Sequence, residues 1–502
     1  MLFEFLVDIS QTHPSLGAAI VALGVLVAWR FWRFSIQPSP GHGGAFFSNT
    51  NALLSRAQEY SKTDHSPFTL TIANSLMYVI SRPQDIAEAY RNTETLSFNE
   101  FAQTMMRAFG NTESCIKATF TPLSRDKPGF PNPRGKSLAT LVPQMPMHQL
   151  FPGDNLDFLE KQFLDCVTPR LNMAALRPYQ VRSSSTQGGN RIQEKEDALV
   201  LPLMEWCSDV FTRAGQQAYF GPELANTDLT LAKSFFVFDD LSWQLLYQYP
   251  DFLAGEMRAS RDAIQRALTT YVQLPQDQRH GDAWFTKAVE NEMRALGIKS
   301  TPTHRKISFW LLTYLLHHGL HYINAIRTET NPAFLTPTNP LPDLTYLHNH
   351  CPLLDALWNE TIRMSTYSAS VRLITADTPL GGKILRKGNR VLLPSRQLHF
   401  DPAFFGADSP VDEFRPERFV GKGSRNLARG DVWRPFGGGV TMCPGRYVAK
   451  RFVLLFVVLV LRRFDVEMVE RRLPVADVGK PVVGTVSMRE GEEVWVRVTE
   501  RV

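Results

Sequence analysis

The chain has 502 residues, of which 44% are hydrophobic and 21% charged, so its composition supports a large packed core and excludes an intrinsically disordered chain. The net charge of +5 comes from 54 basic and 49 acidic residues, an excess too small to suggest the basic patch of a nucleic-acid-binding protein. The five cysteines are scattered and form no C-x-x-C pair, which argues against a disulfide framework and against a zinc site.

The first 35 residues predict a transmembrane anchor. An apolar run extends from Leu16 to Trp29, and Arg30 and Arg33 follow it among aromatic residues. The run is shorter than the ~20 residues of a spanning helix, but aromatic and basic side chains can extend it to Phe34. The basic side is expected to face the cytosol, together with the rest of the chain. A cleaved signal peptide is disfavoured because the charge order is reversed.

The Pro- and Gly-rich residues 36–45 predict a hinge, and we expect residues 46–502 to form one domain. Within this domain, alternation in Thr69–Ser81 predicts two short strands, and Pro83 predicts a helix start. Helical periodicity dominates from about residue 155 to residue 370.

Strand patterns return toward the end of the chain. The segment Lys383–Leu393 predicts a hairpin with a Gly-Asn turn, and a further strand pattern lies within Val482–Val498. The apolar run Phe452–Leu461 is too short to span a membrane and predicts a buried core helix. These patterns together predict a mainly α fold with small β-sheets, in the α+β class.

The segment from Phe436 to Arg446, FGGGVTMCPGR, is the strongest candidate for a functional site. Its glycines, Gly437 and Gly439 among them, let the backbone turn tightly and approach a flat ligand. Pro444 and Gly445 then open a long apolar helix, whose N-terminal dipole favours an anion such as the Cys443 thiolate. The segment is therefore suited to hold a metal through Cys443; the alternative is a glycine turn with a buried cysteine.

This F-x-x-G-x-x-x-C-x-G pattern resembles the haem loop of the cytochrome P-450 superfamily. Two further segments in the expected order support the resemblance. Glu360 and Arg363 match the family's E-x-x-R helix motif, and Arg418 lies in a P-E-R-F segment. The resemblance implies a buried Glu360–Arg363–Arg418 charge cluster that braces the cysteine loop, since such charges are costly to bury unless they satisfy one another.

The resemblance implies the cytochrome P-450 fold and haem b bound through the iron to Cys443. Phe436, Gly437, Gly439 and Gly445 would shape the haem loop. Arg372 would bind a haem propionate, although it could equally be a surface arginine. Thr441 stands where many members carry a second arginine for this purpose.

The sequences of these motifs are similar to those of the branch that contains sterol 7α-hydroxylases and prostacyclin synthase, and to those of its fungal relatives. It implies a monooxygenase that oxidises a hydrophobic small molecule, such as a terpenoid, a steroid or another secondary metabolite. Electrons from NADPH would arrive through a separate NADPH-cytochrome P-450 reductase at an endoplasmic-reticulum-type membrane, because no dinucleotide-binding motif is present in the chain.

The helix that carries the family's oxygen-handling residues is short in this sequence. The predicted helix Thr303–His318 spans only about 24 Å and contains Ser308 and Thr313 as its interior hydroxyls. Either coding sequence is missing here, which would leave an inactive haem-binding product, or the enzyme is an isomerase or dehydratase. His317 and His321 have metal-like spacing, but Gly319 between them predicts an interhelical turn.

Two apolar clusters fall where the family lines its substrate pocket, although ordinary core is an equally good interpretation. They are Phe101, Met105, Met106 and Phe109, and Phe235, Phe236, Phe238, Trp243, Leu246 and Tyr247. Basic residues near the cysteine segment suit docking of an acidic flavoprotein, and these are Arg425, Arg429, Arg434, Arg446, Lys450 and Arg451.

Overall fold

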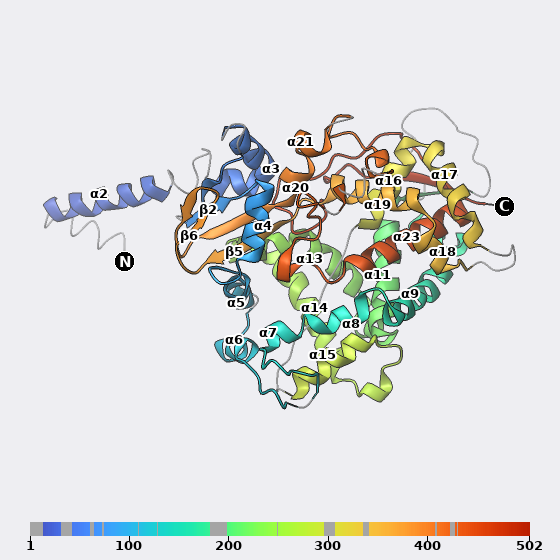
Figure 1. The fold of residues 1–502 in the computed structure, drawn as a ribbon, viewed down its shortest axis with the longest axis horizontal. Coiled ribbons are helices and arrows are strands. Elements are labelled where there is room, and N and C mark those ends of the chain that lie inside the picture. The colour runs from blue at the N-terminus through green and yellow to red at the C-terminus, as the bar shows by residue number, and fades with distance from the viewer. Residues whose placement is uncertain are drawn as a thin grey trace. The chain divides into compact units, whose positions relative to one another are not determined.

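The computed structural model describes residues 14–31, 43–60, 65–72, 75–108, 110–127, 129–180, 198–247, 249–295, 307–334, 341–406, 409–421, 427–428 and 430–501. Helices dominate these ranges, and the strands form small sheets, as the sequence predicts (Figure 1). The chain divides into two compact units. The first contains Met1–Phe98, Ser370–Gln397 and Val478–Pro481, and the second contains Asn99–Ala369, Leu398–Asp477 and Val482–Val502.

The first unit is built on a five-stranded sheet whose strands come from distant parts of the chain, blue and orange in Figure 1. Its order is β1-β2-β8-β5-β3, with bounds Phe68–Ile72, Ser75–Val79, Arg390–Pro394, Ala369–Ile374 and Leu96–Ser97. The antiparallel pair β1–β2 confirms the two predicted strands, and helix α4 (Pro83–Arg91) begins at the predicted proline. Helix α3 spans Gly43–Tyr60.

The predicted hairpin at Lys383–Leu393 is wrong. Strand β7 (Lys383–Leu385) pairs with β6 (Thr378–Leu380), whereas β8 pairs in parallel with β2. Residues Val391 to Pro394 of β8 are buried, because this strand lies inside the five-stranded sheet between β2 and β5. Burial in the sheet interior therefore decides the partner, and the Gly-Asn turn joins strands of two different sheets.

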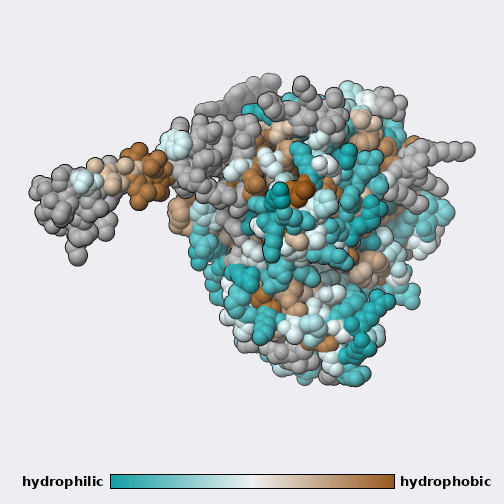
Figure 2. Space-filling view, turned by 60° about the vertical axis from the view of Figure 1, so that its left-hand side comes forward, coloured by the Kyte–Doolittle hydropathy of each residue, from teal (hydrophilic) through white to brown (hydrophobic). Residues whose placement is uncertain are grey.

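Helix α2 (Pro14–Phe31) contains the central part of the predicted anchor. Leu23, Val25 and Leu26 are among its exposed apolar side chains, and the described part of the helix is largely brown in Figure 2. Among the described residues, no helix combines the length and the apolar character needed to cross a bilayer. Residues 1–13 of the predicted anchor, residues 32–35 and most of the hinge lie outside the described ranges.

The second unit holds most of the helices. The longer ones have the following bounds: α5 Phe98–Ala108, α6 Glu113–Phe120, α8 Gln144–Leu150, α9 Asp154–Val167, α11 Leu203–Phe220, α13 Leu231–Leu246, α14 Gly255–Gln273, α15 Trp284–Ala295, α16 Ile307–His318, α17 Leu320–Thr330, α19 Pro352–Ser365 and α23 Arg446–Arg463. The shorter ones are α7 Leu138–Leu141, α10 Met173–Leu176, α12 Glu223–Thr227, α18 Leu344–Asn349 and α21 Pro402–Phe405. Helix α20 (Ser395–His399) begins in the first unit and ends in the second.

A three-stranded sheet completes the second unit. Strand β10 (Trp495–Glu500) lies between β4 (Leu199–Pro202) and β9 (Phe464–Met468) and pairs antiparallel with both. The strand pattern predicted within Val482–Val498 is therefore only partly correct, since the strand begins at Trp495.

Helix α23 is the centre of the core. Every residue from Phe452 to Leu461 is buried, which confirms the predicted core helix. Helices α9, α16 and α17 pack against it. Because α23 begins three residues after Cys443, the core fixes one end of the cysteine loop.

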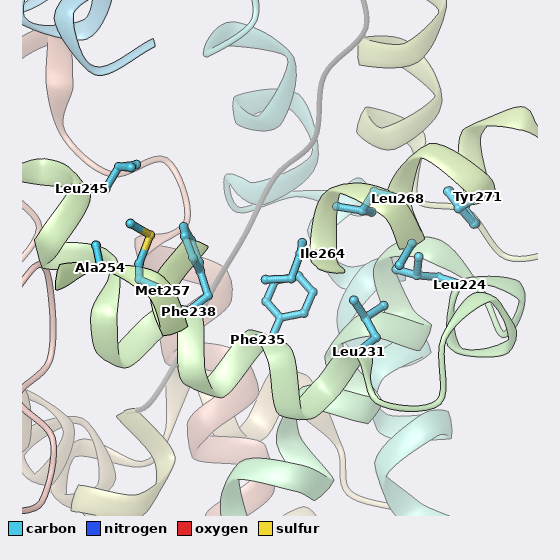
Figure 3. Packing of buried hydrophobic residues seen from close by; sticks show 11 residues of the cluster. Leu224, Leu231, Phe235, Phe238, Leu245, Ala254, Met257, Ile264, Leu268 and Tyr271 are labelled. Atoms are coloured by element: carbon cyan, nitrogen blue, oxygen red, sulfur yellow. The ribbon is translucent and has the colours of Figure 1, made fainter. Parts of the chain in front are cut away.

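Two residues of one predicted apolar cluster, Phe235 and Phe238, lie in a helix–helix core. Phe235 and Phe238 of α13 face α14, where Phe238 lies beside Met257 and Phe235 beside Ile264 (Figure 3). Phe238 therefore serves packing, because its side chain is buried in the contact between α13 and α14. In the other cluster, Phe101 and Met105 are buried on α5, while Phe109 lies outside the described residues.

Candidate functional site

The cysteine loop, residues 436–445, is closed by its own backbone. Gly437 and Gly439 have φ values of +75° and +58°, a region that other residues rarely adopt. The Cys443 N–H donates to the carbonyl oxygen of Phe436 over 3.0 Å, and the Gly437 N–H donates to the carbonyl of Arg434 over 3.2 Å. The two glycines thus permit a tight loop that carries a half-buried Cys443 thiol.

Helix α23 starts directly after this loop, at Arg446. The N-terminus of α23, with its unpaired backbone N–H groups and the positive end of the helix dipole, is therefore close in the chain to Cys443. Arg446 also braces the loop, because its Nη1 donates to the Cys443 carbonyl over 2.9 Å. The Arg446 guanidinium lies 4.7 Å and 4.4 Å from the ring centres of Phe151 and Tyr447.

The three predicted charged residues meet in one buried cluster. Arg363 Nε lies 2.8 Å from Glu360 Oε2, and Arg418 Nε lies 3.4 Å from Glu360 Oε1. Their side chains are 5% exposed or less, so the charges are removed from water and stable only as a set. The Arg415 N–H adds a further hydrogen bond to Glu360 Oε1 over 2.8 Å.

The charge cluster also holds the surrounding backbone in place. Arg363 Nη1 donates to the carbonyl oxygens of His399 (3.0 Å) and Val411 (2.7 Å). Arg418 donates to the carbonyls of Phe405 and Pro410. These bonds tie helix α19 and the P-E-R-F segment to the backbone between residues 399 and 411, and bracing of the cysteine loop itself stays a prediction.

A cavity of about 240 Å³ opens beside Cys443. The cysteine loop and α23 contribute one wall through Cys443, Pro444, Gly445, Val448, Ala449 and Phe452. Helix α11 contributes Phe211, Thr212, Gly215, Gln216, Tyr219 and Phe220, and other helices add Pro146, Leu150, Phe235 and Phe285. The lining is mostly apolar, with Thr212 and Gln216 as polar exceptions. Sequence analysis missed the residues of α11, because periodicity indicates a helix but not the wall that it forms.

Arg372 lies in strand β5 of the first unit and is only 1% exposed. The alternative of a surface arginine is therefore wrong. Its guanidinium lies 5.5 Å from the Tyr90 ring centre and 5.6 Å from that of Phe98. Burial lowers the pKa of the Arg372 guanidinium. Its predicted role toward a haem propionate stays a prediction.

Helix α16, the candidate for the oxygen-handling helix, has 12 residues in the described chain. Thr313 is fully buried on it, while residues 303–306 of the predicted helix lie outside the described ranges. Gly319, with φ of +84°, ends α16 and separates it from α17. His317 and His321 therefore belong to different helices, and the shared-face argument for a metal site fails.

Several basic residues near the cysteine loop already have acidic partners. Arg434 pairs with Asp431, Lys450 with Asp355, and Arg451 with Asp157 and Glu160. Arg425 and Arg429 lie outside the described residues. The exposed part of the loop is instead apolar, with Val440 78% and Met442 37% exposed.

Cys443 offers a single protein ligand, which suits an iron ion whose other ligands belong to its own cofactor. Among the described residues, no group of three or more His, Cys, Asp and Glu side chains could hold a metal ion. A soft thiolate beside an apolar cavity matches iron carried in an apolar ring, whose own nitrogens complete the coordination. The residues present therefore fit haem, with Cys443 as the protein ligand.

Comparisons with known proteins agree with this fit. The family model described as cytochrome P-450 matches residues 243–490. A cytochrome P-450 monooxygenase from Penicillium oxalicum is 26% identical over 499 residues, covering 93% of this chain and 92% of the relative. A 5-beta-cholestane-3-alpha,7-alpha-diol 12-alpha-hydroxylase from Sus scrofa is 26% identical over 384 residues, covering 69% of this chain and 72% of the relative.

A solved structure has the same fold. The heme domain of a cytochrome P-450 mutant superposes with a TM-score of 0.62 at 16% identity. The match covers 93% of this chain and 97% of that domain. The expected fold class is therefore confirmed.

Proposed function

Because this chain belongs to the cytochrome P-450 superfamily and is an oxidoreductase of the monooxygenase type, we propose that it oxidises a hydrophobic small molecule of steroid or terpenoid size. The observation that carries the proposal is the apolar cavity beside Cys443. Relatives named as monooxygenases and as a sterol hydroxylase support an oxidation over the isomerase or dehydratase alternative.

Residues of the cysteine loop would hold the cofactor, and residues of the cavity lining would hold the substrate. Bound haem supplies the iron centre for oxygen chemistry, and a Cys443 thiolate ligand donates electron density to that iron. The α23 N-terminus and the closed loop keep the sulfur in place. The aromatic and aliphatic lining contributed by α11, α13 and α23 excludes water from the space beside Cys443, which haem and an apolar substrate would share.

The cofactor assignment is tested with the full chain loaded with haem, reduced and exposed to carbon monoxide. The wild type is expected to show the absorption band of thiolate-ligated haem, and Cys443→Ser to lose it. Cys115→Ser is the matched control, because Cys115 lies on α6, outside the cavity lining. A thiolate band that persists in Cys443→Ser contradicts the assignment.

We also propose that NADPH supplies the electrons through a separate reductase. A bifunctional relative from Gibberella moniliformis, named as a cytochrome P-450 and NADPH–P-450 reductase, joins both activities in one chain. Turnover of a steroid and terpenoid panel is expected only when NADPH and a purified reductase are both present. Product formed without either component would contradict this proposal.

A membrane anchor within the first 35 residues remains a proposal, supported by the exposed apolar side chains of α2. Removal of residues 1–35 is expected to move the protein from the membrane pellet to the supernatant of fractionated cells. Equal fractionation of both forms would exclude an anchoring role for residues 1–35.

A further inference from the structure

His399 occupies a buried position between the charge cluster and the cysteine loop. It ends helix α20 and is 0% exposed. Its ring lies 5.0 Å from the Trp433 ring and 6.4 Å from the Phe405 ring, measured between centres. These contacts fix the plane of the imidazole without using either ring nitrogen.

His399 accepts one hydrogen bond through its backbone carbonyl oxygen and another through its ring. Its carbonyl oxygen accepts from Arg363 Nη1 over 3.0 Å. Its Nε2 lies 3.1 Å from the backbone nitrogen of Arg434, which can only donate. Nε2 must therefore carry the lone pair, and the proton of the neutral ring resides on Nδ1.

The Arg434 backbone connects this bond to the metal ligand. The Arg434 carbonyl accepts the Gly437 N–H, and the carbonyl of Phe436 accepts the Cys443 N–H. A continuous path therefore runs from Glu360 and Arg363 through one imidazole to the backbone that closes the loop. Between Arg363 and Cys443 on this path, the His399–Arg434 link is the one that uses the acceptor atom of a side chain, whereas the other links end on backbone carbonyls.

We propose that His399 is a positioning residue, which uses Nε2 to hold Arg434 and thereby sets the place of the Cys443 sulfur. This inference rests on the proposed function insofar as the sulfur is to bind haem iron. The bond itself belongs to the protein alone and can be measured without the cofactor.

Two amide variants provide a matched test. In His399→Gln the side-chain oxygen can reach the place of Nε2, whereas in His399→Asn it reaches only the place of Nδ1. Both variants introduce an amide, and they differ by one methylene. Because glutamine is also closer to histidine in volume, His399→Met controls for a role limited to filling space: it has the length of glutamine but lacks the amide oxygen, so it should behave like His399→Asn if the acceptor is what matters.

The first measurement is hydrogen exchange at the Arg434 amide in haem-free protein, followed by mass spectrometry. We expect His399→Asn to speed this exchange about fivefold, as for the loss of one buried hydrogen bond, and His399→Gln to stay close to wild type. Equal acceleration in both variants overturns the proposal.

The second measurement is the proportion of thiolate-ligated to thiol-ligated carbon monoxide complex in haem-loaded protein. We expect this ratio to fall about fivefold in His399→Asn and to recover in His399→Gln. Equal ratios in wild type and His399→Asn overturn the positioning role. If the wild type lacks the thiolate band while the exchange result holds, the cofactor assignment fails and the His399–Arg434 clamp stands.

Discussion

Two regions that meet at Cys443 are built in opposite ways. The charge cluster and the cysteine loop are held by short, directional bonds between buried or half-buried groups, such as Glu360 with Arg363 and Phe436 with Cys443. The cavity wall on α11 is held by packing and carries few polar groups. The first region fixes a single atom in place, whereas the second provides a shape. Substitutions should therefore affect stability in the first region and ligand binding in the second.

The largest effect is expected from Glu360→Gln. This substitution leaves the Arg363 and Arg418 guanidinium groups buried without their carboxylate, which should cost about 3–5 kcal/mol of unfolding free energy. Haem incorporation should fall with it. Urea unfolding and the haem content of purified protein measure the two effects.

Glu113→Gln is the control, because Glu113 forms an exposed pair with Arg107 and should change stability little. Similar losses in Glu360→Gln and Glu113→Gln would show that burial of the cluster is not what makes it important.

A change of pH should have a smaller effect on the free energy of unfolding for each pH unit. Burial, and then the charge of Arg363, lowers the pKa of His399 to about 3 in the folded protein. The unfolded chain binds a proton on this histidine near pH 6.5, whereas the folded chain does not, so acidification favours unfolding. Between these two values, His399 should reduce the unfolding free energy by about 1.4 kcal/mol for each pH unit of acidification.

The measurement compares urea unfolding of wild type and His399→Gln across this pH range. The variant lacks the titrating ring, so its stability should depend less steeply on pH. Parallel curves for the two proteins would mean that His399 is protonated in the fold as readily as in the unfolded chain.

The smallest change in stability is expected on the cavity side, at Gly215. A Cβ at this helical position meets no atom within 4 Å, so Gly215→Leu can extend into the cavity without a backbone clash. Replacing a mid-helix glycine should even raise stability by about 0.5–1 kcal/mol. Substrate-induced spectral shifts and turnover should nevertheless be lost, because the leucine occupies ligand space.

Gly215→Ala shares the gain in helix stability and adds only one methyl group, so it should retain most of the binding. If Gly215→Leu binds substrate as wild type does, the cavity beside Cys443 is not the substrate site.

The same contrast explains what could be predicted from the sequence. Residues joined by short-range patterns were found, since E-x-x-R, P-E-R-F and the glycine-rich loop each place their residues through local geometry. The core position of α23 followed from its continuous apolar run. The cavity lining of α11 was not found, because which side of a helix borders a cavity depends on the helices packed around it.

Two further misses have the same origin in distant contacts. The Gly-Asn turn suggested a hairpin, but β8 is paired by β2, more than 300 residues earlier in the chain. His399 stood within a segment that resembled the family, yet nothing local indicates that its ring accepts a hydrogen bond from Arg434.

The parallel pair β2–β8 also has a consequence for biosynthesis. Strand β2 is complete at residue 79, but its partner leaves the ribosome only after residue 394 has been made. At a translation rate of about 5–20 residues per second, the edge of β2 that pairs with β8 stays without this partner for at least about 15 seconds. The sheet of the first unit therefore closes late, and a nascent chain held in this interval is where chaperone dependence should be sought.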